Sequence, residues 1–221
     1  LYLNLNSLNH RKMNTVFDMI NDSKRSQLEI ISNVSYTLLW DYLVPYKKEK
    51  LPDDVTFRVS VGKKNYDVIR LFESGEYFFS QKFIDVLSQF MDMSDKCYPI
   101  KIEGIKEQYY VIYNLEEFLY LNKEKAMFDK EPPFYCGKEL TTPLFCITNT
   151  LIFVVSEELK NALIKNKISN IRFKESFLCT KQEYKEWKKL IERIYDYAPY
   201  IHHIHSATDL CWCFLPSFPR E

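Results

Sequence analysis

Glycine is scarce in this sequence: the 221 residues contain four, Gly62, Gly75, Gly104 and Gly137. Loops that hold phosphate groups need clustered glycines, because the backbone must approach the ligand closely. No two of the four are near enough to form such a loop. The sequence also lacks a G-x-G-x-x-G motif, a Walker A motif and a G-x-S-x-G elbow. Nucleotide-binding folds that depend on these loops are therefore excluded.

Excess charge of either sign is absent too, since 30 Lys and Arg residues balance 30 Asp and Glu residues. A general nucleic-acid binder needs surplus basic charge to displace counterions, so we expect no nucleic-acid partner. Long hydrophobic runs are missing as well. The longest, Leu144 to Val155, is interrupted by Thr148, Asn149 and Thr150, so we expect no membrane span.

The start of the sequence shows no sustained apolar stretch typical of a secretory signal. We therefore expect a cytoplasmic protein, with Met13 as a candidate true start and residues 1–12 dispensable. In a reducing cytosol the default state of cysteine is a free thiol. We expect that state for all six cysteines, which are Cys97, Cys136, Cys146, Cys179, Cys211 and Cys213.

One cluster near the end contains residue types that bind zinc: His202, His203, His205, Asp209, Cys211 and Cys213. Its spacing fits no known structural zinc site, because there is no C-x-x-C pair and the C-x-C brackets a Trp. We therefore predict no metal site and no cofactor here, and interpret the segment as a packed aromatic and thiol tail. A Cys–His nucleophile pair is the catalytic alternative, but no orienting partner stands out.

Aromatic residues are abundant, with 16 Tyr, 16 Phe and 3 Trp in a chain that is 46% hydrophobic. They are typical of a large core, and also of a contact surface, because Tyr and Trp anchor protein interfaces. The sequence alone does not divide the aromatic residues between these two roles.

Hydrophobic spacing predicts several elements. Val16, Met19, Ile20, Leu28 and Ile31 share one helical face, which predicts a helix over residues 15–32. Residues 38–44 fit either a strand or a helix. Residues 55–61 alternate strictly, which indicates a half-buried strand, and residues 109–115 favour a central strand. Three prolines and a glycine predict a long surface loop over residues 129–143.

Two segments follow the same order of strand, serine, helix and strand. The first has a strand at residues 77–79, Ser80, a helical face from Phe83 to Phe90 and a strand near Ile100. The second has residues 152–155, Ser156, a helix from Glu157 and a strand around Ile171. Ser80 and Ser156 are predicted N-caps, which explains both serines without catalysis.

After Leu178, the sequence Thr180 to Glu183 forms a capping box that begins an amphipathic helix ending near Tyr197. The fold class is therefore α+β, a mixed sheet with two repeated strand–helix–strand units and a C-terminal amphipathic helix. We divide the chain into an N-terminal helix and strand region at 1–76, a repeated α+β domain at 77–178, and a helix with an irregular tail at 179–221.

The repeat, together with the strand between its copies, resembles a family of bacterial immunity proteins from polymorphic toxin systems, formerly a domain of unknown function. The match covers roughly residues 77–176. The matching elements are residues 78–83, 109–115, 143–147, 154–163 and 170–173. The family often has Gly before the closing aromatic strand, whereas this chain has Asn170.

The resemblance implies a protein that binds and neutralises a cognate toxin, with no catalytic residues to carry over. The residues that contact the toxin stay unknown from sequence, as does the oligomeric state. An uncharacterised cytosolic enzyme that uses the C-terminal His/Cys cluster is one alternative. A general protein-interaction module is the other.

Overall fold

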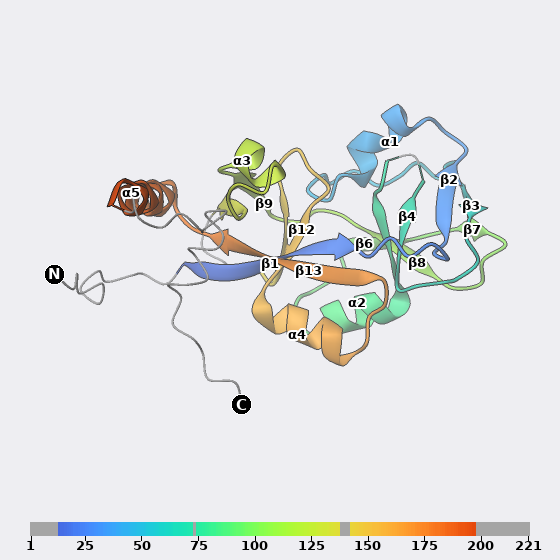
Figure 1. Cartoon of the computed structure of the whole chain (residues 1–221). Coiled ribbons are helices and arrows are strands. Elements are labelled where there is room, and N and C mark those ends of the chain that lie inside the picture. The colour runs from blue at the N-terminus through green and yellow to red at the C-terminus, as the bar shows by residue number, and fades with distance from the viewer. Residues whose placement is uncertain (1–12, 73, 138–141, 198–221) are drawn as a thin grey trace.

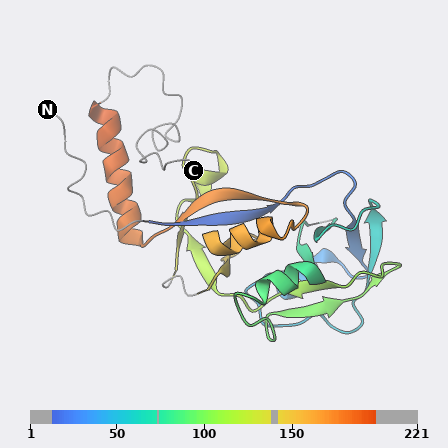
Figure 2. The same ribbon diagram turned by 90° about the horizontal axis from the view of Figure 1, so that it is seen from below.

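The computed structural model describes residues 13–72, 74–137 and 142–197, with side chains up to residue 192. It contains helices and mixed β-sheets, so the predicted α+β class is confirmed. Two sheets lie next to each other, and one helix extends from the body (Figures 1 and 2).

The first sheet closes into a six-stranded barrel. Its strands, in spatial order, are β1 (Asn14–Asn21), β12 (Phe153–Val155), β11 (Leu144–Ile147), β9 (Glu117–Tyr120), β10 (Phe134–Cys136) and β13 (Ile171–Leu178). The longest pairing joins β1 and β13 over eight residues, from Asn14 opposite Leu178 to Asn21 opposite Ile171. Side chains that point inward fill the barrel, including Val16, Phe118 and Phe145.

The second sheet has seven strands and is strongly curved. Its order is β6 (Cys97–Ile100), β8 (Tyr109–Ile112), β5 (Tyr77–Ser80), β4 (Val68–Leu71), β2 (Glu29–Ser32), β3 (Phe57–Val61) and β7 (Ile102–Glu103). β6 and β7 form opposite edges of this sheet, although Lys101 alone separates them in the chain. One short segment therefore connects the two edges, and the sheet is barrel-like.

The helices of the described residues are α1 (Tyr36–Leu43), α2 (Gln81–Leu87), α3 (Lys123–Met127), α4 (Glu157–Lys165) and α5 (Lys181–Tyr197). Figures 1 and 2 both show α2 and α4 side by side on one face of the molecule, where the two sheets meet. They share the largest hydrophobic cluster, in which Phe83 of α2 and Leu159 of α4 are fully buried with Phe79 and Phe153. Both sheets contribute residues to this cluster. The apolar area that they bury together stabilises the contact between the sheets.

The segments around α2 and α4 have the same strand topology. β5 and β6 both pair antiparallel with β8, so β8 lies between them and they run parallel to each other. In the barrel, β12 and β13 both pair antiparallel with β1, which lies between them in the same way. β4 and β11 extend the two arrangements on the same side, as antiparallel partners of β5 and β12.

The two predicted serine caps are confirmed. Ser80 Oγ accepts from Phe83 N at 3.3 Å, and Ser156 Oγ accepts from Leu159 N at 3.3 Å. Each serine has the extended backbone of an N-cap and satisfies one of the unpaired amides of the first helical turn. Ser80 Oγ also donates to Asp67 Oδ1 at 2.9 Å.

The predicted helix over residues 15–32 is wrong. This segment forms β1 and β2, which belong to different sheets. β1 is apolar on both faces because Val16 points into the barrel while Met19 packs in the cluster with α2 and α4. A strand buried on both sides lacks polar alternation, so its apolar residues imitate helical spacing.

Three other predictions have definite outcomes. The segment at residues 38–44, which fitted a strand or a helix, contributes to α1, and the strand predicted at residues 55–61 is confirmed as β3. The strand predicted at residues 109–115 is confirmed as β8, which has a partner on each side. The loop prediction at 129–143 is wrong in part, because β10 pairs there with β9 and β13. The boundaries at 76/77 and 178/179 stay predictions.

α5 begins at the capping box. Glu183 N donates to Thr180 Oγ1 at 3.1 Å, and Thr180 N donates to Glu183 Oε2 at 2.6 Å. Tyr184 and Trp187 then pack on Phe134 of the barrel, with ring centroids 5.1 and 4.6 Å away. These aromatic contacts lie in the first two turns of α5, so the rest of the helix extends beyond them (Figure 2).

Candidate functional site

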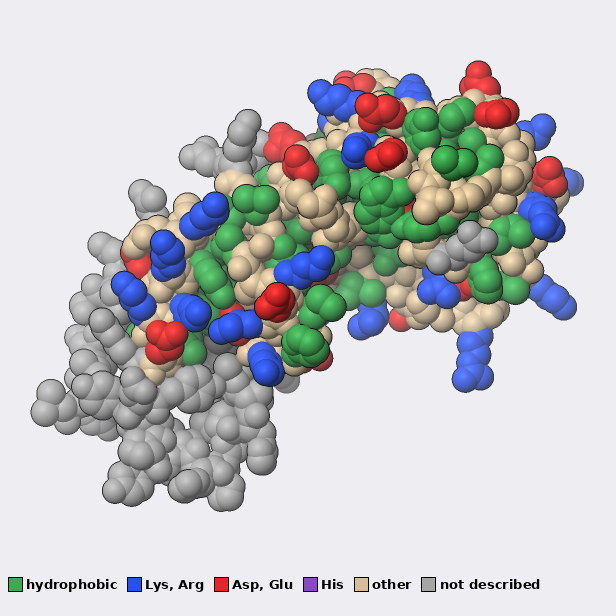
Figure 3. All heavy atoms as spheres, turned by 90° about the horizontal axis from the view of Figure 1, so that it is seen from above, with side chains coloured by type: hydrophobic (Ala, Val, Ile, Leu, Met, Phe, Trp, Pro, Cys, Tyr) green, Lys and Arg blue, Asp and Glu red, His purple; other side chains and the backbone are tan. Residues whose placement is uncertain are grey.

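Partly exposed hydrophobic side chains gather where α1 lies. Figure 3 looks onto the face that carries α1 and α3, and shows hydrophobic side chains grouped over the α1 half. Leu38 of α1 is 65% exposed, and Phe72 in the turn between β4 and β5 is 52% exposed. We define the aromatic surface as these two residues with the half-buried Tyr36, Trp40 and Tyr42 of α1. At about 100° per residue, Leu38 and Tyr42 flank the buried face of α1 on one side, whereas Tyr36 and Trp40 flank it on the other.

The sequence of α1 explains why this surface forms. Leu39 and Leu43 lie four residues apart and pack on the core of the seven-stranded sheet. Leu38 and Tyr42 have the same spacing but point to a second face. α1 therefore has more apolar side chains than its contact with the sheet can bury.

The flanks of α1 are also aromatic and tightly arranged. Tyr36 and Trp40 form an edge-to-face pair with ring centroids 6.0 Å apart. Such a pair fixes the direction of both rings before any partner arrives. Large aromatic side chains held in this way lose little conformational entropy on binding. The aromatic surface is therefore suited to contact another protein.

A buried carboxyl lies at the base of this surface. Glu76, immediately before β5, is 2% exposed. Burial raises the pKa of Glu76, although the Ser74 hydroxyl and the nearby Tyr36 oppose that shift. In turn, burial and the neighbouring Glu76 raise the pKa of Tyr36 to about 12. The carboxyl and the phenol are therefore close enough to influence each other.

A second buried carboxyl, Asp18 of β1, lies inside the barrel. Its Oδ1 accepts from Tyr135 Oη at 2.9 Å and from Ser176 Oγ at 2.7 Å. Burial raises the pKa of Asp18 to about 6, against the opposing effects of these hydrogen bonds and of Lys174. Asp18 is 6% exposed and its two hydroxyl partners are fully buried, so this arrangement is part of the barrel core.

A third polar cluster joins the two sheets. Asp67 Oδ2 accepts from Ser169 N at 2.8 Å and from Ser169 Oγ at 2.6 Å, while Oδ1 accepts from Ser80. Lys82 Nζ lies 3.7 Å from Asp67 Oδ2. A serine beside an acid is one component of a nucleophilic site, but Ser80 here caps α2 and connects Asp67 to it. The cluster therefore has a structural role.

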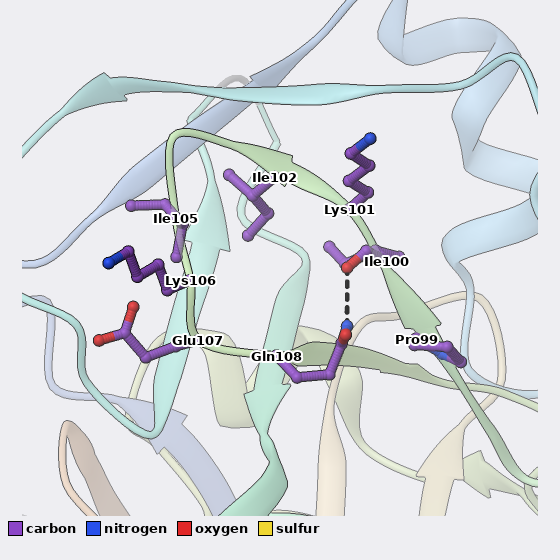
Figure 4. A pocket seen from close by; sticks show the side chains of 8 residues that line it. All are labelled: Pro99, Ile100, Lys101, Ile102, Ile105, Lys106, Glu107 and Gln108. Carbon is purple, nitrogen blue, oxygen red and sulfur yellow. Dashed lines mark hydrogen bonds between the residues drawn. The ribbon is translucent and has the colours of Figure 1, made fainter.

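One surface cavity of about 310 Å³ lies at the bend between the edges of the seven-stranded sheet (Figure 4). Its lining is contiguous in sequence, from Pro99 to Ile102 and from Ile105 to Gln108. Gln108 spans it, since its Nε2 donates to Ile100 O at 2.8 Å. No convergent titratable groups line it, because Lys101, Lys106 and Glu107 come from one short stretch.

The described cysteines are free, and burial raises the pKa of Cys97, Cys146 and Cys179, the last to about 12. A thiol that stays protonated near neutral pH is a poor nucleophile. Within the described ranges, no three His, Cys, Asp or Glu side chains lie together as a metal site would require. No helix within these ranges has the length and apolar character needed to cross a bilayer.

The C-terminal segment considered above for zinc binding or nucleophilic catalysis falls outside the described residues. It comprises His202, His203, His205, Asp209, Cys211 and Cys213. The aromatic surface and Glu76 were not predicted from sequence. The sequence feature that could have indicated this surface is the largely apolar segment from Leu38 to Val44, which places apolar side chains on more than one face of a helix.

Comparisons with known proteins leave the family open. No protein-family model, no curated protein and no solved structure matches this chain.

Proposed function

We propose that this protein acts by binding another protein, and that its partner is a cognate bacterial toxin which it neutralises in the cytoplasm. The observation that supports protein binding is the aromatic surface, where Leu38 and Phe72 are more than half exposed. Exposed apolar patches that contain aromatic residues favour protein contacts. The toxin part of the proposal comes from the family resemblance over residues 77–176.

The proposal includes a duplication. We infer that the segments around α2 and α4 are two copies of one strand–helix–strand unit. Their support is the matching topology, with an antiparallel strand inserted between the two parallel strands of each unit. Matching serine caps add to it. In this arrangement the paired helices lie on one face of the molecule, and α1 lies on another (Figure 1).

Co-expression with the toxin encoded by the adjacent gene tests the toxin proposal. We expect growth to be rescued and the two proteins to co-purify in a fixed ratio. An inhibitor of this kind must occupy its toxin nearly always, so the Kd should be on the order of nanomolar or tighter. Protection by trace amounts of the chain, without a stoichiometric complex, would instead indicate an enzyme and contradict the proposal.

Leu38→Glu tests the aromatic surface in the same assay. Because it places a charge in the contact region, we expect the Kd of the complex to rise at least about tenfold. Ile164→Glu is the matched control, since Ile164 is 57% exposed on α4, away from α1 (Figure 1). The control should bind as the unmodified protein does. Equal binding by both variants would place the contact surface elsewhere.

A further inference from the structure

Two cysteines lie next to each other on neighbouring strands of the barrel. β10 and β13 pair in parallel, and the last pair in their register is Tyr135 opposite Leu178. The residues that follow are Cys136 and Cys179. Cys179 N donates to Tyr135 O at 3.0 Å, so the two strands are still hydrogen-bonded at this point. Cys136 and Cys179 are therefore direct neighbours across the strands.

The two cysteine side chains lie on the same face of the sheet. Phe134 and Phe177, two residues earlier on the two strands, are opposite each other, and their rings stack with centroids 5.4 Å apart. The residue that precedes the cysteine on each strand belongs to the cluster that fills the barrel. Because side chains alternate along a strand, Cys136 and Cys179 lie on the outer face with the stacked rings.

The spacing of the two strands suits a disulfide. Neighbouring strands lie about 4.7–4.9 Å apart, and disulfide-bonded cysteines usually have Cα atoms about 4.4–6.8 Å apart. Both cysteines are free thiols in this structure. Among the described cysteines, neither Cys97 nor Cys146 lies opposite a cysteine in its strand pairing. The geometry therefore selects one pair.

The two thiols differ in accessibility, which determines the order of reaction. Cys136 is partly exposed, whereas Cys179 is 6% exposed. Burial, the Glu183 carboxylate and the Cys136 thiol raise the pKa of Cys179 to about 12, so Cys179 is a poor nucleophile towards a reagent in solution. An oxidant from solution therefore reacts first with Cys136. Cys179 then reacts within the molecule, where its proximity to Cys136 compensates for its small thiolate fraction.

We propose that Cys136 and Cys179 form a disulfide when the protein meets a low-molecular-weight disulfide such as glutathione disulfide. The Cys136 thiolate attacks one glutathione sulfur, which breaks the S–S bond of the oxidant, leaves a mixed disulfide on Cys136 and releases one glutathione thiolate. The Cys179 thiolate then attacks Cys136 Sγ, which forms the internal S–S bond and releases the second glutathione thiolate. The two cysteine protons end on the released thiolates, and two electrons pass from the protein to the oxidant.

The disulfide fixes the part of the barrel that supports α5. β10 has three residues, and its Phe134 is the residue on which Trp187 of α5 packs. The new bond holds β10 to β13 immediately before α5 begins. It also closes a loop of about 40 residues, which restricts the unfolded chain and so raises Tm. This inference is independent of the proposed toxin binding.

Peptide mapping of the full chain tests the proposal. The protein is incubated with glutathione disulfide, alkylated, and digested with trypsin without reduction. Trypsin places the two cysteines in separate peptides, residues 131–138 and 175–181. We expect these peptides to be linked, to weigh two hydrogens less than the separate peptides together, and to separate on reduction. A map without this link, a glutathione adduct that stays on Cys136, or a link from Cys136 to Cys211 or Cys213 overturns the proposal.

Thermal unfolding gives a second readout. Oxidation of the unmodified protein should raise Tm by at least about 5 °C. Cys136→Ser and Cys179→Ser each remove one sulfur and should abolish this rise. Cys97→Ser is the matched control, because it removes another partly exposed cysteine and should leave the rise unchanged. Each variant is compared with its own reduced form, and an equal rise in Cys136→Ser would show that a different pair is responsible.

Discussion

Asn170→Ala is expected to lower the free energy of unfolding by about 3–5 kcal/mol, through lost hydrogen bonds and a strained backbone. Asn170 is 1% exposed, and its Nδ2 donates to Gln27 Oε1 and to Val68 O, the latter at 2.8 Å. Its Oδ1 accepts from Lys24 N at 3.3 Å. These contacts join the start of β13 to the β1–β2 connection and to β4, so the substitution leaves buried polar groups unpaired.

Asn170 also has a φ of 67°, in the left-handed region that residues with a Cβ seldom adopt. Asparagine tolerates this region better than alanine does, and glycine tolerates it best. Asn170→Gly is therefore the matched variant, since it loses the same hydrogen bonds without the backbone strain. It should be more stable than Asn170→Ala by about 1 kcal/mol. Urea denaturation measures both, and equal stabilities would show that the backbone conformation contributes nothing.

This position also shows what a sequence departure can mean. In the immunity-protein family whose resemblance underlies our proposal, Gly often stands where this chain has Asn170, and both residue types adopt the backbone conformation found here. The difference between them is the side chain, which in Asn170 supplies buried hydrogen bonds between the sheets. The departure is therefore compatible with the same local backbone.

Local signals in the sequence predicted the elements whose cause is local. Ser80, Ser156 and the Thr180 capping box mark helix starts because their side chains bond to amides three residues away. β3 and β8 were also predicted from short patterns. The helix caps depend on contacts within a few residues, which a sequence pattern can represent. β3 and β8 were recognisable from the apolar character of their own residues, although their partners lie far away in the chain.

Long-range pairing was beyond the reach of the same reasoning. β1 was predicted as helix because its two faces pack against different cores, which only the fold brings together. β10 has three residues and exists through its pairing with β9 and β13. Glu76 resembled any surface acid in sequence, since its burial depends on the turn after β4 and on α1.

The free energy of unfolding is expected to depend on pH through Asp18. Burial raises the pKa of Asp18 from 3.8 to about 6. Between about pH 4 and pH 6, the native state therefore keeps a proton that the unfolded chain has lost. Stability should fall as pH rises through this window, and the contribution should be constant above it. A shift of about two units corresponds to about 3 kcal/mol.

Asp18→Asn removes this titration, while its amide oxygen can still accept from Tyr135 and Ser176. Relative to the variant, the unmodified protein should lose about 3 kcal/mol of stability between pH 4 and pH 7. Urea unfolding at pH 4, 5, 6 and 7 measures that difference. A difference that stays constant over this range would show that Asp18 is ionised in the native state throughout.

Asp67→Asn is the control, because the contribution of Asp67 to the free energy of unfolding should depend on pH in the opposite direction. Burial alone would raise the pKa of Asp67, but hydrogen bonds from Ser169 and Ser80 and the charge of Lys82 hold it below its ordinary value. Its stabilising effect is therefore present above the unfolded-state pKa and is lost as pH falls. Relative to Asp67→Asn, the unmodified protein should lose stability toward acid, whereas relative to Asp18→Asn it should gain. Opposite slopes from two aspartates in one fold would show that the polar cluster between the sheets holds its carboxylate charged, while the barrel interior holds its own protonated.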